Sequence, residues 1–334
     1  MKLLVTGGAG FIGSNFVRHV LNEHADDSIV VLDKLTYAGR MENIAEHEDD
    51  PRFSFVHGAI EDREVAEAAA EGVDAIVNFA AESHVDRSIE EPDAFIKTDV
   101  FGTQVLLEIA RERGIGRYLQ ISTDEVYGSI DEGSFTELSP IDPSSPYSAS
   151  KAGGDMLVQA YFRTYGLPAL ITRASNNYGP YHYPEKLIPL MILNAFAGYK
   201  LPVYGDGMQV RNWLHVEDHC SGIYAALTRG QEGEVYNIGG PDECPNIEVV
   251  QRIVELTGAG DELIEYVKDR PGHDVRYSLS SEKIQGLGWE AKTHFAEGLE
   301  ATVQWYRENE AWWGPIRSGE YLEFYKRQYG KALS

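Results

Sequence analysis

The sequence has little cysteine and no long uninterrupted hydrophobic stretch. Its 334 residues include two cysteines, Cys220 and Cys244, so a disulfide framework is not expected. Neither has a partner at metal-ligand spacing, and we expect ordinary thiols and no metal. No run of about 18 uncharged apolar residues occurs, so no membrane-spanning helix is expected. Because the opening MKLLVTGGAG lacks the features of a secretory leader, we expect a cytoplasmic protein.

Basic residues are also scarce, with 29 Lys plus Arg against 53 Asp plus Glu and a net charge of −24. Such a field repels nucleic acid and anionic membranes, so neither is an expected partner. The acidic residues are spread along the chain, which predicts a solvated acidic surface. Two interpretations stay open: a host with high internal salt, where screening removes the self-repulsion, and an acidic protein of an ordinary mesophile.

Strand-like apolar runs alternate with helical patterns through the first half of the chain. The expected strands are 2–6, 28–32, 53–57, 75–79 and 117–121, and the expected helices are 11–23, 62–71, 88–112 and 146–165. Uninterrupted apolar runs are typical of strands buried on both faces. The alternation predicts an α/β fold of the Rossmann type, a doubly wound parallel sheet covered by helices on both faces.

Beyond about residue 171 the segments become shorter, and prolines, glycines and tyrosines become frequent. We expect helices at 185–197, 217–229 and 246–257, the last with Asn246 as its N-cap, and strands at 201–204, 211–216, 234–238 and 263–267. No Ser/Gly-rich linker divides the chain. We therefore expect residues 1–175 to form a Rossmann domain, to which segments near 205–240 return, and residues 176–334 to form mainly a smaller α/β substrate-binding lobe.

A glycine turn between the first strand and the first helix predicts a dinucleotide site. Gly7, Gly10 and Gly13 let the backbone approach a pyrophosphate, and the following helix offers it free N–H groups. Asp33 ends the second strand, 20 residues after Gly13. A carboxylate there accepts hydrogen bonds from ribose hydroxyls and repels a 2′-phosphate, so the predicted cofactor is NAD rather than NADP.

Five polar side chains form the predicted catalytic set. Tyr147 and Lys151 lie four residues apart on one helical face, and the lysine charge is expected to lower the pKa of the tyrosine. Thr123, Asp124 and Glu125 follow the fifth strand, where ligands bind in open α/β sheets. Thr123 can hydrogen-bond a substrate hydroxyl, and the Asp-Glu pair supplies the acid and the base that an elimination needs.

Segments along nearly the whole chain resemble the dTDP-glucose 4,6-dehydratase family of the extended short-chain dehydrogenase/reductases. They are GGAGFIGS, DKLTYAG, FAAESHVDRSI, ISTDEVYG, SPYSASKA, SNNYGPYHYPEKLIPL and DRPGHDVRY. The resemblance implies three steps on a nucleoside-diphosphate glucose: oxidation at C4, loss of water across C5 and C6, and return of the hydride to C6. Tyr147 would take the 4-hydroxyl proton, Glu125 the C5 proton, and Asp124 would protonate the leaving 6-hydroxyl.

The resemblance also implies binding residues and a homodimer that pairs the 88–112 and 146–165 helices. For NAD it implies Gly7, Gly10, Phe11, Ile12, Gly13, Asp33, Lys34, Leu35, Thr36, Ile60, Ala80, Ala81, Glu82, Ser83, Thr98, Tyr147, Lys151 and Asn177. For the sugar nucleotide it implies Ser83, Thr123, Asp124, Glu125, Asn176, Lys186, Leu187, Pro202, Val203, Tyr204, Arg211, Asn246, Asp269, Arg270, Pro271, Gly272 and His273.

One position departs from the family pattern. Ala59 stands where the family has an aspartate that contacts the adenine amino group, and Glu61 or Asp62 are candidates to compensate. His84, His182, His215 and His219 form no ligand set, and the last three are expected to be structural or polar contacts. A uridine nucleotide, a sugar 4-epimerase, which needs no Asp-Glu pair, and a non-enzymatic NAD sensor stay open as alternatives.

Overall fold

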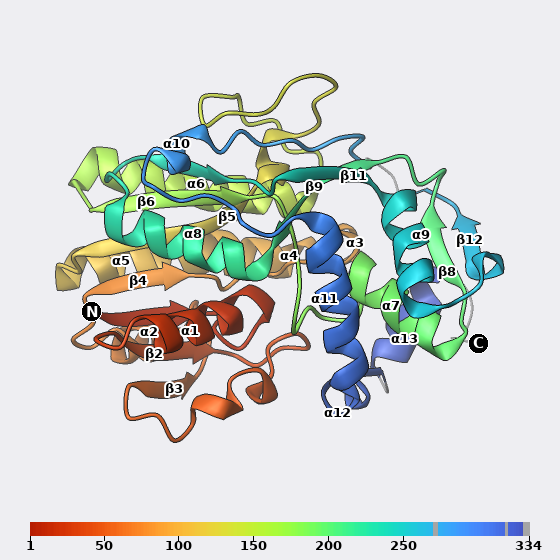
Figure 1. Cartoon of the computed structure of the whole chain (residues 1–334). Helices are drawn as coiled ribbons and strands as arrows, with labels where there is room; N and C mark the ends of the chain where they lie inside the picture. Colours follow the sequence, from red (N-terminus) through yellow and green to blue (C-terminus); the bar gives the residue numbers. More distant parts are fainter. Residues whose placement is uncertain (270–272, 318–319, 330–334) are drawn as a thin grey trace.

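The structure is a computed structural model that describes residues 1–269, 273–317 and 320–329. A sheet of seven parallel strands forms its centre, in the order β3-β2-β1-β4-β5-β6-β10 (Figure 1). The strands are β1 (Lys2–Thr6), β2 (Ser28–Asp33), β3 (Phe53–His57), β4 (Ala75–Asn78), β5 (Arg117–Thr123), β6 (Ala169–Ala174) and β10 (Val235–Ile238). The predicted Rossmann-type α/β fold is confirmed.

Helices cover both faces of this sheet because successive side chains of each strand point to opposite sides. Leu3 and Val5 of β1 join the core under α1 (Phe11–Glu23) and α8 (Val216–Arg229). Leu4 joins the core under the other three helices. These are α2 (Arg63–Ala69), α5 (Thr103–Arg113) and α6 (Pro146–Tyr165).

The single helix predicted over 88–112 is wrong. The segment consists of α3 (Val85–Glu90), α4 (Pro92–Phe95), the π-helical turn η3 (Ile96–Gly102) and α5. Pro92 begins a new helix, since proline cannot donate the hydrogen bond that would continue the old one. The π turn brings Gly102 against Ile60, where a Cβ would lie 2.6 Å from the Ile60 side chain. This close approach sets Thr98 and Asp99 beside the carboxyl ends of the strands.

The second region is built from short elements around its own core and lies beside the Rossmann layers (Figure 1). One sheet holds β7 (Asn176–Tyr178), β9 (Val210–His215) and β11 (Asp242–Pro245), and β8 (Leu201–Tyr204) pairs with β12 (Ile264–Val267). The helices are α7 (Leu187–Ala197), α9 (Asn246–Thr257), α11 (Phe295–Glu308), α12 (Glu310–Trp313) and α13 (Glu320–Tyr329). A further helix, α10 (Glu282–Gln285), packs instead on β10 and α8, and its Ile284 joins the core of the Rossmann layers. The described residues also form five 3-10 turns: η1 (Met41–Asn43), η2 (Ala45–His47), η4 (Asp124–Tyr127), η5 (Asp261–Leu263) and η6 (Pro315–Arg317).

The predicted N-cap at Asn246 is wrong, because Pro245 holds that position and Asn246 is the first helical residue. The pairing of β11 with β9 runs on into the helix, so backbone carbonyls satisfy its first N–H groups. Asn246 donates to Gln209 and Ile247 donates to Gly207.

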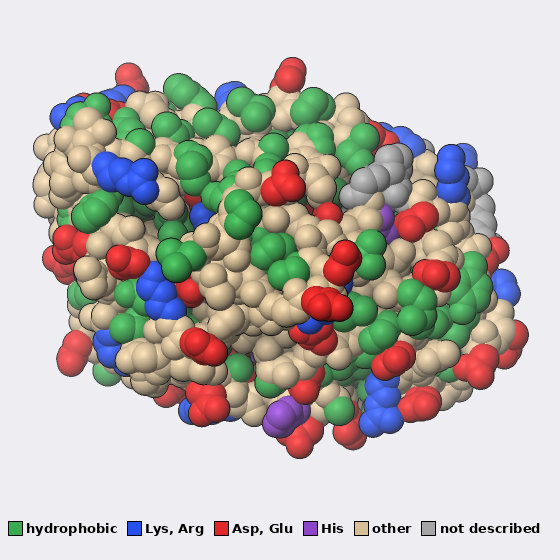
Figure 2. Space-filling model, turned by 90° about the horizontal axis from the view of Figure 1, so that it is seen from above, with side chains coloured by type: hydrophobic (Ala, Val, Ile, Leu, Met, Phe, Trp, Pro, Cys, Tyr) green, Lys and Arg blue, Asp and Glu red, His purple; other side chains and the backbone are tan. Residues whose placement is uncertain are grey.

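Acidic side chains are scattered over the face drawn in Figure 2, with fewer Lys and Arg among them. No single acidic patch dominates that face, in keeping with charge spread along the chain. Within the described ranges, no helix is long and apolar enough to cross a membrane.

Candidate active site

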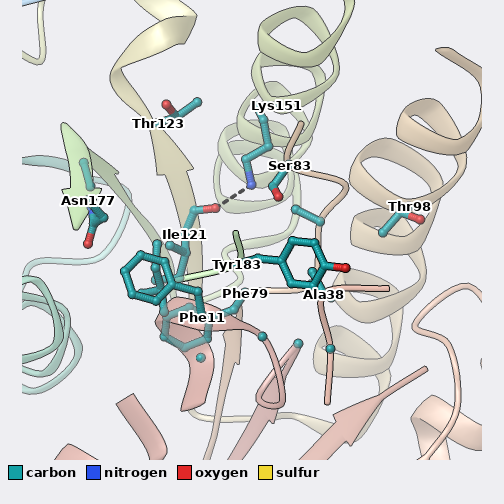
Figure 3. Close-up of a pocket in the computed structure, with 18 of the residues that line it drawn as sticks. Phe11, Ala38, Phe79, Ser83, Thr98, Ile121, Thr123, Lys151, Asn177 and Tyr183 are labelled. Carbon is teal, nitrogen blue, oxygen red and sulfur yellow. Dashed lines mark hydrogen bonds between the residues drawn. The ribbon is translucent and has the colours of Figure 1, made fainter. Parts of the chain in front are cut away.

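A cavity of about 340 Å³ opens at the carboxyl ends of the central strands, and the start of α7 and Trp213 of β9 contribute to its wall (Figure 3). This is where ligands bind in open α/β sheets. The five predicted catalytic residues all line it. Of the predicted NAD residues it is lined by Gly7, Gly10, Phe11, Ile12, Gly13, Asp33, Lys34, Thr36, Ile60, Ala80, Ala81, Ser83, Thr98, Tyr147, Lys151 and Asn177.

The glycine turn brings backbone against backbone at one end of the cavity. Gly7 has a φ of 68°, and a Cβ on Gly13 would lie 2.2 Å from the Gly7 carbonyl oxygen. A side chain at Gly13 would therefore push α1 away from the turn, and one at Gly7 would lie 2.7 Å from the Ala80 backbone nitrogen. The first turn of α1 carries no acidic residue, which leaves the positive end of its dipole available to a phosphate.

Asp33 is held by two backbone donors. Its Oδ2 accepts from the Ala9 N–H at 3.0 Å and its Oδ1 from the Leu35 N–H at 2.8 Å. Burial raises the pKa of Asp33, and these N–H groups and the charge of Lys34 oppose that rise. A Cβ on Gly39 would lie 2.7 Å from Oδ1, so the glycine leaves space beside the carboxylate. Leu35 itself, a predicted NAD residue, does not line the cavity.

Beyond Asp33 the cavity wall is formed by the turn after β3. Lys34 donates to the Thr98 hydroxyl at 3.1 Å and lies 3.3 Å from a Glu82 oxygen, so Glu82 contacts the lysine rather than the cavity. Of the two acids proposed to compensate for Ala59, Glu61 lines the cavity, whereas Asp62 caps α2 by accepting from the Val65 N–H.

The Thr-Asp-Glu tripeptide bends out of β5 into η4. The Thr123 hydroxyl donates to Asp124 Oδ1 at 3.3 Å and accepts from the Glu125 N–H at 3.3 Å. Asp124 is 1% exposed. Burial and the neighbouring Glu125 charge raise the pKa of Asp124 to about 8, against the opposing effect of Arg211. Asp124 is therefore a protonated, neutral acid near pH 7, a state that can give up a proton.

The predicted effect of Lys151 on Tyr147 is wrong in this structure. Burial raises the pKa of Tyr147, and the charges of Glu125 and Asp99 add to that rise. Lys151 Nζ instead donates to the Ile121 carbonyl at 2.7 Å, as the dashed line in Figure 3 shows. Its charge also acts on Asp99, whose pKa burial raises to about 6. The spacing on the helix brought the two side chains to one cavity but did not fix which partner the ammonium takes.

The predicted sugar-nucleotide residues divide into two groups. Ser83, Thr123, Asp124, Glu125, Asn176, Lys186 and Leu187 line the cavity. The others in the described ranges do not, and we call them the outer cluster: Pro202, Val203, Tyr204, Arg211, Asn246, Asp269 and His273. Arg270, Pro271 and Gly272 lie outside the described residues.

The outer cluster is held together by contacts among segments of the second region. Asp269 accepts from Gln209 at 3.1 Å, and its other oxygen lies 2.6 Å from the His273 ring. Arg211 donates to the Asp274 carbonyl at 2.9 Å. Because the charge of Arg211 lowers the pKa of Asp124, the cluster is electrostatically linked to the cavity.

Two histidines interpreted as structural or polar contacts also line the cavity. The His182 ring stacks on Phe11, with centroids 4.1 Å apart. His219 Nδ1 lies 2.8 Å from Asn177 Oδ1. Asn177 uses its amide group to donate to Ser175, so Oδ1 accepts from His219, and the Nε2 of the neutral ring is left as an acceptor. Burial lowers the pKa of His219 to about 3, which keeps the ring neutral.

The sequence contained a signal that each of these histidines lies near the site. His182 lies within the SNNYGPYHYPEKLIPL segment, and His219 follows the end of β9 by four residues. Further lining residues without an earlier prediction include Ala38, Gly39, Phe79, Ser122, Tyr183 and Glu185.

Buried polar atoms without partners mark the cavity as a ligand site. Within the described part of the chain, eight of its side chains each have a buried polar atom that makes no hydrogen bond. These are Glu61 Oε2, Ser122 Oγ, Asp124 Oδ2, Asn176 Oδ1, His182 Nδ1, Glu185 Oε1, Trp213 Nε1 and His219 Nε2. Buried polar groups normally find partners, so a ligand rich in hydroxyl, amide and amino groups fits this lining. Together with the glycine turn and Asp33, the donor and acceptor set fits a dinucleotide.

Comparison with known proteins agrees with this geometry. The family model described as GDP-mannose 4,6 dehydratase matches residues 4–302. A dTDP-glucose 4,6-dehydratase of Streptomyces niveus is 52% identical over 95% of this chain and 96% of its own. A Haloferax volcanii protein named low-salt glycan biosynthesis protein is 54% identical over 92% of this chain and 98% of its own.

A solved structure shows the same fold. It is a dTDP-glucose 4,6-dehydratase of Streptomyces venezuelae with NAD bound, with a TM-score of 0.92 and 54% identity over 95% of this chain and 100% of that one. The motif resemblance is thereby confirmed over nearly the full length. The chain belongs to the GDP-mannose 4,6-dehydratase family, and several of its relatives at about half identity are dTDP-glucose 4,6-dehydratases.

Proposed function

We propose that this protein is an NAD-dependent hydro-lyase that converts dTDP-glucose to dTDP-4-keto-6-deoxyglucose, a step of deoxysugar biosynthesis. The observation that carries the proposal is the pair Asp124 and Glu125 beside Tyr147 in one cavity. An acid with a pKa of about 8 next to a carboxylate supports proton donation and proton abstraction at adjacent carbons. The names and bound NAD of the similar proteins support the substrate and the cofactor.

Each side chain has one task in this reaction. Tyr147, assisted by Thr123, takes the proton of the 4-hydroxyl. Glu125 removes the C5 proton once C4 is a ketone, and Asp124 protonates the departing 6-hydroxyl. NAD, when bound, supplies the hydride acceptor at C4 and the hydride donor at C6, so it need not leave between cycles. The glycine turn and Asp33 would hold it.

A raised tyrosine pKa does not contradict this role. Tyr147 takes the 4-hydroxyl proton in its phenolate form, so its own proton first leaves to solvent, and the raised pKa sets how much of the protein is in that form. The charges of Glu125, Asp99 and Asp124 raise the pKa of Tyr147, and a hydrogen bond with Thr123 lowers it. Lys151, by binding the Ile121 carbonyl, keeps a positive charge close to the cofactor end of α6.

We also propose the predicted homodimer. Apolar side chains on η3, α3 and α6 are exposed, among them Ile96 at 54%, Phe101 at 51% and Met156 at 44%. Large exposed apolar groups on neighbouring helices are typical of a surface that binds another protein. In a two-fold symmetric dimer, the same helices of the two subunits pack against each other. Sedimentation of the parent and of a Phe101→Glu variant measures this, since a charge at the interface should produce monomers.

The two-region division and a cytoplasmic site of action remain part of the proposal. Residues 1–175 with α8, β10 and α10 form the Rossmann layers, and the other described residues from 176 onward form the proposed substrate lobe. Nucleoside-diphosphate sugars are cytoplasmic metabolites, which supports that compartment. Cell fractionation tests it.

The deciding experiment incubates the purified protein with dTDP-glucose and, separately, with UDP-glucose. The alkali-dependent absorbance of the keto sugar and the loss of one water by mass report the reaction. Product from dTDP-glucose that disappears in Glu125→Gln supports both the dehydratase activity and the role of Glu125 as the catalytic base. Product from UDP-glucose alone would change the nucleotide, and an epimer without water loss would overturn the dehydratase.

A further inference from the structure

The order of the strands fixes which part of a dinucleotide meets which turn. In the sequence of neighbours β1-β2-β3, the glycine turn follows β1, Asp33 ends β2, and the turn Gly58–Glu61 follows β3. A pyrophosphate on the glycine turn and a ribose on Asp33 direct the attached base toward the third turn. Gly58, Ala59, Ile60, Glu61 and Thr98 all line that end of the cavity.

Most of the groups at this end cannot accept a hydrogen bond from a base. Ala59 and Ile60 have apolar side chains, and Lys34 occupies one of the two acceptor positions of the Thr98 hydroxyl, at 3.1 Å. Asp62 is turned away from the cavity, because it caps α2. The remaining side-chain acceptor of the turn is Glu61.

Glu61 has an acceptor without a donor. Its side chain is 11% exposed, and its Oε1 lies 3.7 Å from Lys34 Nζ, which is an ion pair too long for a hydrogen bond. Its Oε2 is buried and makes no hydrogen bond within the described residues. A buried carboxylate oxygen without a donor is costly, and a ligand that brings an N–H group to it removes that cost.

We propose that Glu61 accepts a hydrogen bond from the exocyclic amino group of the cofactor's adenine and selects 6-aminopurine dinucleotides. The residue would do from position 61 what Ala59 cannot do. The inference rests on the proposed function only in taking the cofactor to be NAD. It concerns binding and not turnover.

The test compares two dinucleotides on protein stripped of cofactor. NAD carries the 6-amino group, and nicotinamide hypoxanthine dinucleotide presents a carbonyl oxygen there. The parent should bind NAD at least about tenfold more tightly, the effect of a hydrogen bond to a charged acceptor. Calorimetry gives both dissociation constants, and their ratio within one protein is insensitive to a general loss of stability.

Variants at Glu61 test whether this residue sets the ratio of the two dissociation constants. Glu61→Leu should bring the two affinities to within about threefold. Glu61→Gln should bind the hypoxanthine dinucleotide more tightly than the parent does, because its amide can donate to the carbonyl oxygen. Partial unfolding cannot produce such a gain. Glu64→Gln, an exposed acid in the first turn of α2, is the matched control and should keep the ratio of the parent.

Ala59→Asp in the Glu61→Leu background should restore the preference for NAD, since it returns a carboxylate to the same turn. The proposal is overturned if the parent binds both dinucleotides equally, or if Glu61→Leu weakens both by one factor, which would make Glu61 only a partner of Lys34. A protein that shows the expected ratio but removes no water from dTDP-glucose would refute the proposed function and leave this inference intact.

Discussion

The two ends of the cavity both carry buried carboxyl groups, yet their surroundings act on them in opposite ways. At the adenosine end, two backbone N–H groups and Lys34 oppose the rise that burial causes in the pKa of Asp33. At the catalytic end, the Glu125 charge adds to burial and takes the pKa of Asp124 to about 8. Burial alone therefore does not decide the state of a carboxyl group. Its neighbours decide whether it serves as a fixed anion or as an acid.

The largest difference between the two ends of the cavity is expected from Tyr147→Phe, which removes one hydroxyl group from the catalytic end. Turnover should fall by about 10²- to 10⁴-fold, the usual contribution of a positioned acid or base. NAD affinity in stripped protein should change by less than about tenfold, because the anchors of the adenosine end are intact. Steady-state kinetics and calorimetry measure the two effects. Tyr165→Phe, an exposed position on the same helix, should leave both unchanged, and full turnover in Tyr147→Phe would refute the assigned role.

Asp33→Asn tests the other end. It keeps one acceptor oxygen and removes the charge, so NAD should bind about tenfold more weakly, while the repulsion of a 2′-phosphate also disappears. The ratio of NADP to NAD dissociation constants should therefore move toward one. Asp62→Asn lies outside the cavity and should keep the parent ratio. An unchanged ratio in Asp33→Asn would show that Asp33 does not select the cofactor.

The first half of the site was predictable because topology restricts it. The ends of β1, β2 and β5 must meet at one edge of a parallel sheet, so the glycine turn, Asp33 and Thr123 could be brought together from sequence order alone. β6 was missed, although Ala169–Ile171 is apolar and follows Pro168, because the change of composition begins inside it.

The second half depends on contacts that no periodicity specifies. Arg211, Asn246 and Asp269 reach one cluster through short strands from three separate segments. The electrostatic partners of the site residues could not be predicted either, since the helical spacing of Tyr147 and Lys151 does not reveal that Lys151 binds the Ile121 carbonyl. The break of the 88–112 helix had a visible signal in Pro92.

Asp124 also makes a pH-dependent contribution to stability. Its pKa of about 8 lies above the ordinary value near 4, so between these pH values the folded state holds a proton that the unfolded state has released. The free energy of unfolding therefore falls as pH rises from about 4 to about 8, and this loss is complete above about 8. Asp124→Asn removes this component.

The melting temperature of Asp124→Asn relative to the parent should accordingly increase from pH 5 to pH 8. Thermal unfolding of the stripped protein at several pH values measures it, and Asp49→Asn, at an exposed acid, should show no such trend. A difference that is constant with pH would mean that Asp124 is already ionised at neutral pH and is not the acid of the elimination.

The smallest expected effect concerns the acidic surface and involves neither end of the cavity. With a net charge of −24, self-repulsion opposes the folded state in dilute buffer, and molar KCl shortens the screening length to about 3 Å. We expect the melting temperature to rise by at least roughly 2–4 °C between dilute buffer and molar KCl, a gain of about 1 kcal/mol. A variant with Glu48→Gln, Asp49→Asn and Glu300→Gln, three exposed acids, should rise less. Equal stability at both salt concentrations would favour an acidic protein of an ordinary mesophile over a host with high internal salt, since the acidic surface would then carry no measurable self-repulsion.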